Sequence, residues 1–132
     1  EAWLSMPDGH GAQAQAVLEA YSGRVHLFEG GDVLPLGVKS IAAYGHTPGH
    51  TCFEKDSILV IADILHGAAL QLEHPEYCPF FDMDPAAAIE SRLRILAYAR
   101  EHGLRMYGHH LPSPGYICIF NSQQDPFIGQ KF

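Results

Sequence analysis

The sequence of 132 residues lacks a long hydrophobic run, an excess of basic residues and any closely spaced pair of cysteines. No apolar stretch reaches the roughly 18 residues that a membrane-spanning helix needs, so we expect no membrane partner. Eight Lys and Arg residues stand against 15 Asp and Glu residues, and the formal net charge is −7 with neutral histidines. This acidic balance argues against nucleic acid as a partner. It does not exclude a small-molecule substrate, because a bound divalent metal can reverse the local electrostatic field.

The three cysteines, Cys52, Cys78 and Cys118, are too widely spaced to suggest a disulfide framework or a zinc ribbon. We expect partly buried thiols in a reducing compartment, which favours a cytoplasmic protein. Cys52 lies two residues after His50, so its spacing also permits an approach to a metal site there.

The hydrophobic pattern predicts one domain, or one piece of a domain, that contains both helices and strands. A first helix is expected over residues 11–21. Strands are expected over residues 25–28, 38–44, 51–54, 57–62, 68–72, 104–107 and 116–120. The stretch 57–62 is almost wholly apolar, which predicts a strand covered on both faces.

The strongest helix signal begins at Asp84 and ends at Gly103. Asp84 suits the N-cap, Pro85 suits the first helical position, and Gly103 suits the C-terminal end. The expected buried stripe consists of Ile89, Leu93 and Leu96, with Arg92, Arg94 and Arg100 outside it.

The segment 45–51, GHTPGHT, carries two imidazoles four residues apart on a loop that Gly and Pro keep out of any helix. Asp63 follows an apolar strand, and His110 follows the strand predicted over residues 104–107. Side chains at the ends of adjacent strands can converge although they are far apart in sequence. Histidine and carboxylate side chains presented in this way are typical ligands of a catalytic metal. The residues alone are therefore compatible with a metal site that contains His50, Asp63 and His110, without requiring one.

Four segments together resemble the C-terminal half of the metallo-β-lactamase superfamily: GHTPGHT, IADILH at 61–66, FDMDP at 81–85 and YGHHLPSPG at 107–115. The likeness is closest to the branch of methyl parathion hydrolase-like enzymes and acyl-homoserine lactonases, and it covers about residues 1–120. It implies the α+β fold of that family, the αββα sandwich. Residues 1–132 would then form only the C-terminal βα half, a mixed sheet with flanking helices.

The resemblance also implies roles for individual residues. His50 matches a ligand of the first metal, Asp63 matches the aspartate that bridges two metals, and His110 matches the last ligand of the second. His46 matches a histidine that is not a ligand in the family. The implied cofactor is a pair of Zn²⁺ ions, although imidazole and carboxylate suit other divalent metals too. The implied function is hydrolysis of a lactone, a β-lactam or an organophosphate ester by a metal-bridging hydroxide, with Asp63, His50 and His110 as catalytic residues.

The family's His-x-His-x-Asp-His signature, which supplies two ligands to each metal, is absent from these 132 residues. His50, Asp63 and His110 alone leave two ligands per ion, too few for a tight zinc site. We therefore expect a partial domain, inactive or weakly active alone, that needs its N-terminal half or a second copy. Half a sandwich would also expose an apolar sheet face, which favours homo-oligomers. Two alternatives stay open: a non-catalytic self-associating half-domain, and a module in which His50, Asp63 and His110 hold one metal.

Several neighbouring residues allow more than one interpretation. His66 either lines the pocket or packs, and we favour packing because most lone histidines pack. His109 competes with His110, which we favour because Leu-Pro follows it directly. Tyr107, Phe80 and Phe81 form either an apolar substrate wall or ordinary core. Surface or packing roles are expected for His10, His26, His74 and His102, and loop or cap roles for Glu73, Glu76, Asp82 and Asp84.

Overall fold

A computed structural model describes residues 2–5 and 10–119 of the chain. The helical elements are η1 (Ala2–Ser5), α1 (His10–Ala20), η2 (Pro35–Gly37), α2 (Ala68–Gln71) and α3 (Pro85–His102). The strands are β1 (Val33–Leu34), β2 (Val38–Ala42), β3 (Thr51–Lys55), β4 (Ile58–Ala62), β5 (Arg105–Gly108) and β6 (Tyr116–Cys118). In the described part of the chain, no helix is long and apolar enough to cross a membrane.

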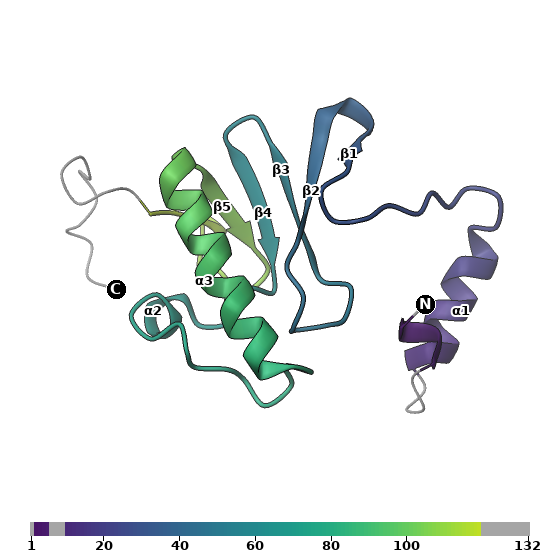
Figure 1. Cartoon of the computed structure of the whole chain (residues 1–132), viewed down its shortest axis with the longest axis horizontal. Helices are drawn as coiled ribbons and strands as arrows, with labels where there is room; N and C mark the ends of the chain where they lie inside the picture. Colours follow the sequence, from purple (N-terminus) through teal and green to yellow (C-terminus); the bar gives the residue numbers. More distant parts are fainter. Residues whose placement is uncertain (1, 6–9, 120–132) are drawn as a thin grey trace.

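The six strands form one mixed sheet in the order β1-β2-β3-β4-β5-β6 (Figure 1). All neighbours are antiparallel except β4 and β5, which are parallel and are connected through α2 and α3. The α+β class and the mixed sheet with flanking helices are thus confirmed.

Two of the predicted strands are wrong. Residues 25–28 form no strand, because that edge of β2 is already occupied by β1 and by the preceding loop. In this loop the Gly31 N–H donates to the Ser40 carbonyl, and the Ser40 N–H donates to the Asp32 carbonyl. Residues 68–71 form α2 rather than a strand, because Gln71 folds its side chain back onto the backbone N–H groups of His66 and Gly67. The last residue of the strand predicted over 116–120 lies outside the described residues.

Helix α3 has the predicted ends but a different buried face. The Asp84 side chain accepts a hydrogen bond from the Ala87 N–H, and Gly103 ends the helix in the left-handed conformation (φ 62°). The buried face consists of Ala88, Ser91, Arg92, Ile95, Leu96 and Ala99. The predicted stripe is confirmed at Leu96, whereas Ile89 is only half-buried. It is wrong at Leu93, which is exposed, and Arg92 is fully buried instead because loop carbonyls bind its guanidinium.

The hydrophobic core lies between α3 and one face of the sheet. Its buried members include Cys52, Leu59, Ile61, Ile95, Ala99 and Met106. The opposite face carries Phe53, Ile58, Val60, Tyr107 and Tyr116, which we call the open sheet face; pairing across β3, β4, β5 and β6 places them together. Ile58, Val60 and Tyr116 are exposed there, so the prediction that β4 is covered on both faces is wrong for this chain.

Candidate metal centre

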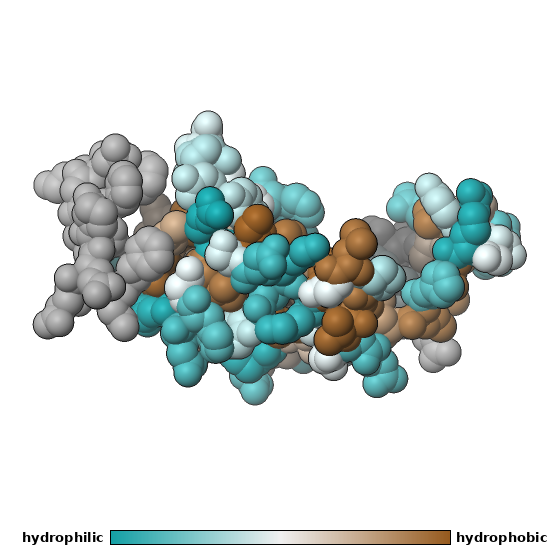
Figure 2. All heavy atoms as spheres, turned by 90° about the horizontal axis from the view of Figure 1, so that it is seen from above, coloured by the Kyte–Doolittle hydropathy of each residue, from teal (hydrophilic) through white to brown (hydrophobic). Residues whose placement is uncertain are grey.

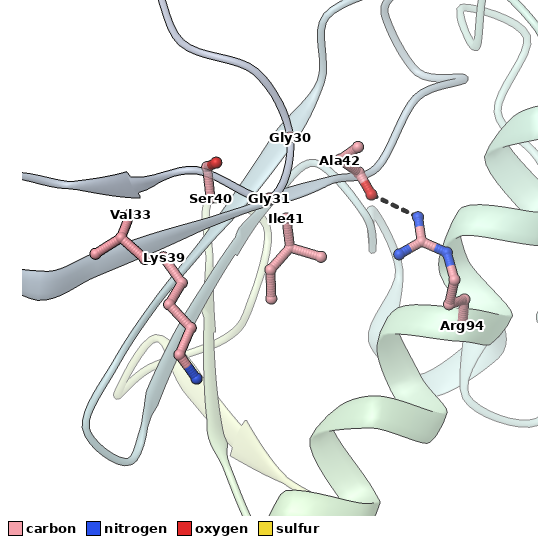
Figure 3. A pocket seen from close by; sticks show the side chains of 8 residues that line it. All are labelled: Gly30, Gly31, Val33, Lys39, Ser40, Ile41, Ala42 and Arg94. Carbon is pink, nitrogen blue, oxygen red and sulfur yellow. Dashed lines mark hydrogen bonds between the residues drawn. The ribbon is translucent and has the colours of Figure 1, made fainter.

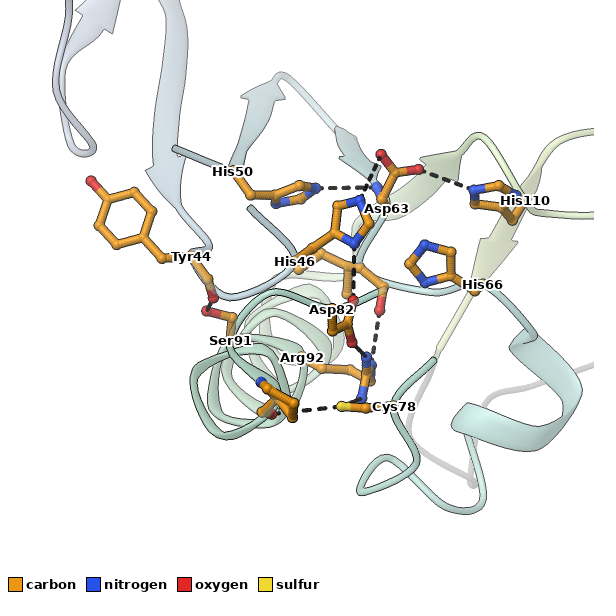
Figure 4. A network of polar contacts seen from close by, with 12 residues as sticks. Tyr44, His46, His50, Asp63, His66, Cys78, Asp82, Ser91, Arg92 and His110 are labelled. Atoms are coloured by element: carbon orange, nitrogen blue, oxygen red, sulfur yellow. Dashed lines mark hydrogen bonds and ion pairs between the residues drawn. The ribbon is translucent and has the colours of Figure 1, made fainter. Parts of the chain in front are cut away.

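The predicted site residues meet at one edge of the sheet, where three loops converge (Figure 4). Asp63 follows β4 directly and His110 lies two residues beyond β5, so the parallel pairing of these strands brings both to the same edge. His46 and His50 come from the loop between β2 and β3. The structure therefore brings His50, Asp63 and His110 together, as expected from the strand ends.

The loop that carries His46 and His50 is fixed against the start of α3. Gly45 (φ 129°) accepts a hydrogen bond through its carbonyl from the Asp84 N–H at 2.9 Å. The His46 carbonyl accepts one from the Met83 N–H at 3.3 Å, and Ser91 Oγ donates to the Tyr44 carbonyl at 2.7 Å. These bonds also satisfy backbone groups near the helix N-terminus, which would otherwise lack partners.

The Asp63 carboxylate is the centre of the cluster. Its Oδ1 lies 3.2 Å from His110 Nε2 and 3.4 Å from His109 Nδ1, and its Oδ2 lies 3.7 Å from His46 Nε2. Burial alone would raise the pKa of Asp63, but the hydrogen bond from His109 and the nearby imidazoles outweigh it and lower the pKa. Asp63 is therefore an ionised acceptor at neutral pH.

His50 is buried, and its Nε2 accepts the backbone N–H of Asp63 at 3.2 Å. Burial and the neighbouring His46 lower the pKa of His50, so the ring is neutral at pH 7, the form that binds metals. Its buried Nδ1 has no hydrogen-bond partner among the described residues.

His66 belongs to the cluster as well. Its ring centroid lies 4.7 Å from that of His110 and 5.0 Å from that of His46, with the Phe81 ring at 4.9 Å. Candidate ligand atoms of Asp63, His66 and His110 all lie within 4.8 Å of one another. Of the two interpretations offered by the sequence, the structure favours a place beside the site over simple packing.

A buried ion pair between Asp82 and Arg92 supports His46. His46 Nδ1 lies 2.9 Å from Asp82 Oδ1, and Asp82 Oδ2 lies 3.5 Å from the Arg92 guanidinium. Both Asp82 and Arg92 side chains are fully buried. Sequence reasoning missed this pair because Asp82 resembles a loop acid and Arg92 resembles a solvated helix residue; no local signal marks their contact.

The remaining residues that the sequence offered as candidates differ in their contacts and exposure. His109 approaches Asp63 as His110 does, but its side chain is more exposed, 72% against 47%. Phe81 contacts the rings of His46 and His66, whereas Phe80 is 97% exposed. The Tyr107 ring contacts the Tyr116 ring at a tilt of 36° on the open sheet face. His74 pairs with Glu76, His102 contacts the Tyr98 carbonyl, His26 is exposed, and the His10 side chain lies outside the described residues.

Cys52 points into the core and away from the cluster, where burial raises its pKa to about 12. The approach to a metal that its spacing permitted is therefore wrong. We predict that Cys52 stays unlabelled by a thiol reagent at pH 8 in the native protein and is labelled fully in denaturant, as measured by peptide mass mapping. Rapid native labelling would show that the thiol is accessible.

A pocket of ≈ 360 Å³ lies elsewhere, between β2, the preceding loop and α3 (Figure 3). Gly30, Lys39, Ala42 and Arg94 contribute to its lining, and none of the clustered histidines does. This pocket is therefore separate from the histidine cluster.

The donor atoms of the cluster suit a divalent metal. Several imidazoles and one carboxylate match the ligands of catalytic zinc and of other first-row metals. Buried Nδ1 atoms of His50 and His66 that lack partners among the described residues are also consistent with a ligand at this place.

Comparisons with known proteins find solved structures of similar fold. The chain resembles the solved hydrolase AbOPH of the beta lactamase superfamily, with 26% identity and a TM-score of 0.76, over 92% of this chain and 48% of that one. It also resembles AidC, a dizinc quorum-quenching lactonase (23% identity, TM-score 0.67, 84% of this chain and 42% of that one). A probable metal-dependent hydrolase from Staphylococcus aureus matches at 24% identity and a TM-score of 0.58, over 68% of this chain and 33% of that one.

The two likenesses under 25% identity show the fold alone. No family model matches the chain, and neither does any curated protein. The chain spans about half the length, or less, of these solved structures. They confirm the resemblance to the metallo-β-lactamase superfamily and the partial form of its fold.

Proposed function

We propose that this chain, which has part of the metallo-β-lactamase fold, supplies the C-terminal half of the active site of a metal-dependent hydrolase. His50, Asp63 and His110 would hold two divalent metal ions, with Zn²⁺ the first choice. The observation that carries the proposal is the convergence of one ionised carboxylate and several imidazoles at one edge of the sheet, beside the ends of the parallel strands β4 and β5. Such sites in α/β sheets commonly lie where strand ends meet.

When bound, the metals supply Lewis-acid chemistry that polarises a substrate oxygen and makes water a nucleophile near pH 7. The chain's own residues arrange the site. The Asp63 N–H orients the His50 ring, and Asp82 fixes His46 beside the Asp63 carboxylate. Phe81 provides an apolar wall next to His46. We propose a small lactone, β-lactam or organophosphate ester as the substrate class.

The remaining ligands would come from a complementary half that carries the His-x-His-x-Asp-His signature. The open sheet face supports this, because exposed aromatic and branched side chains on a sheet normally have a partner. Hydrophobic surface also gathers over the turn between β1 and β2 and on α1 (Figure 2), where Val33, Leu36 and Val17 are exposed. Helix α1 packs on η1 and lies to one side of the sheet (Figure 1).

The proposal is tested by supplying the missing motif. The chain would be co-expressed with a half-domain that carries His-x-His-x-Asp-His, and hydrolysis of a lactone and of an organophosphate ester would be measured. We expect turnover from the pair, background rates from either half alone, and background rates from a pair with Asp63→Asn. His74→Ala, an exposed histidine paired with Glu76, serves as the matched control and should keep full activity. Equal rates for Asp63→Asn and the unmodified pair would refute the assignment.

The open sheet face also supports a second candidate, a non-catalytic half-domain that associates with itself. Sedimentation of the purified chain separates the two. Stable dimers that do not exchange for the complementary half, together with unchanged folding of His50→Ala and His110→Ala, would favour this second function.

A further inference from the structure

We infer that the chain by itself holds one divalent cation, on Asp63, His66 and His110, so that His66 is a metal ligand. The inference deepens the proposed function, since it concerns the same site. Its ligand set differs from that of the proposed function, because it contains His66. Neither the position of residues at strand ends nor the family resemblance gave His66 a metal-binding role.

The geometry favours this set of three. Asp63 Oδ1 and His110 Nε2 are 3.2 Å apart, and the rings of His66 and His110 lie close, with a 4.7 Å centroid separation. All three residues offer a ligand atom within 4.8 Å of the others. Two imidazoles and one carboxylate form the usual three-ligand set of a catalytic zinc, which keeps a fourth position for water or substrate.

The neighbouring histidines have other partners. His46 Nδ1 is tied to buried Asp82, and its Nε2 is 3.7 Å from Asp63 Oδ2, as expected of a residue that positions the carboxylate. The His50 Nε2 is engaged by the Asp63 N–H. His66 Nδ1 is buried and has no hydrogen-bond partner in the described ranges. The same is true of His50 Nδ1, but the group whose ligand atoms lie within 4.8 Å of one another contains His66 and not His50.

The backbone of His66 is held rigidly in place. Gln71 is only 4% exposed, and its Oε1 accepts the His66 N–H at 2.7 Å and the Gly67 N–H at 3.1 Å. Its Nε2 donates to the Tyr77 carbonyl at 2.8 Å, so the buried amide is satisfied at both ends. A ligand whose backbone is fixed before the metal arrives loses less entropy on binding.

Zinc titration of the full chain tests the inference. We expect the unmodified chain to bind one Zn²⁺, measured by calorimetry and by metal content after dialysis. His66→Ala should weaken binding by more than about 100-fold, beyond the 10- to 100-fold effects typical of residues that only support a ligand. His74→Ala, the matched histidine control, should bind as the unmodified chain does. His66→Cys, which replaces one zinc ligand by another, should restore tight binding.

The possible failures are distinct. If the chain binds no Zn²⁺, or if His66→Ala binds it unchanged, the inference is wrong, whereas the hydrolase proposal on His50, Asp63 and His110 stands. If Asp63→Ala also leaves both zinc affinity and the turnover of the complemented pair unchanged, both fail. Circular dichroism checks that each variant folds, and His66→Gln replaces His66→Ala if the smaller residue does not.

Discussion

Replacing Arg92 with alanine is expected to destabilise the fold by about 3–5 kcal/mol, because it leaves a buried carboxylate without its partner. The guanidinium donates to the Ile64 carbonyl at 2.8 Å, to the Pro75 carbonyl at 2.6 Å and to the Tyr77 carbonyl at 3.1 Å. It also faces Asp82 Oδ2 at 3.5 Å. One side chain thus ties the loops between β4 and α3 to the helix.

The same change should loosen the metal centre. Without Arg92, the Asp82 carboxylate would keep His46 but lose its permanently charged partner, and it would move or take up a proton. We therefore expect zinc affinity to fall along with stability. Arg92→Lys should recover only part of the loss, because one ammonium cannot replace the planar fork of a guanidinium.

Arg100→Ala is the matched control, because Arg100 lies exposed in the last turn of α3. It acts on stability only through the helix dipole, so its loss should change the free energy of unfolding by at most about 1 kcal/mol. Denaturant unfolding and zinc titration measure the two effects. Equal unfolding midpoints for Arg92→Ala and Arg100→Ala would show that the buried ion pair does not hold the loops.

Arg92 also shows where prediction from the sequence stops. The ends of α3 could be predicted because Asp84, Pro85 and Gly103 act on their own turns of the helix. The buried face could not, because its centre is an arginine whose partners lie 10 to 28 residues away. In the same way, Gln71 converts an expected strand into α2 through contacts that no hydrophobic pattern encodes.

The candidate site likewise contains residues that could be predicted from the sequence and residues that could not. The meeting of Asp63, His50 and His110 follows from side chains placed at strand ends, so the spacing of strands and motifs was sufficient. The contact of Asp82 with His46 could not be predicted, because it spans 36 residues, and the sequence indicated only a loop or cap role for Asp82. Motifs and strand ends in the sequence therefore locate the residues that face the site. Only the packed structure reveals the residues that hold these side chains in position.

Gly45→Ala is the second change for which we expect a large effect. It should lower the free energy of unfolding by at least about 3 kcal/mol, because the new methyl group would clash and the backbone conformation already disfavours alanine. A Cβ at this position would lie 2.1 Å from Ala88 N and 2.4 Å from Ala88 Cα. These are backbone atoms of α3 and cannot turn aside as a side chain would. The φ of 129° is itself unfavourable for alanine.

The loop would have to leave α3 to accept the methyl group, and it would carry His46 and His50 with it. The hydrogen bond from the Asp84 N–H to the Gly45 carbonyl would break, and this N–H group at the start of α3 would lose its acceptor. Gly49→Ala, in the same loop, meets no atom within 4 Å and should change stability by no more than about 0.5 kcal/mol. If the two variants unfold at the same denaturant concentration and bind Zn²⁺ equally, then the close approach of this loop to α3 is not what positions the two histidines.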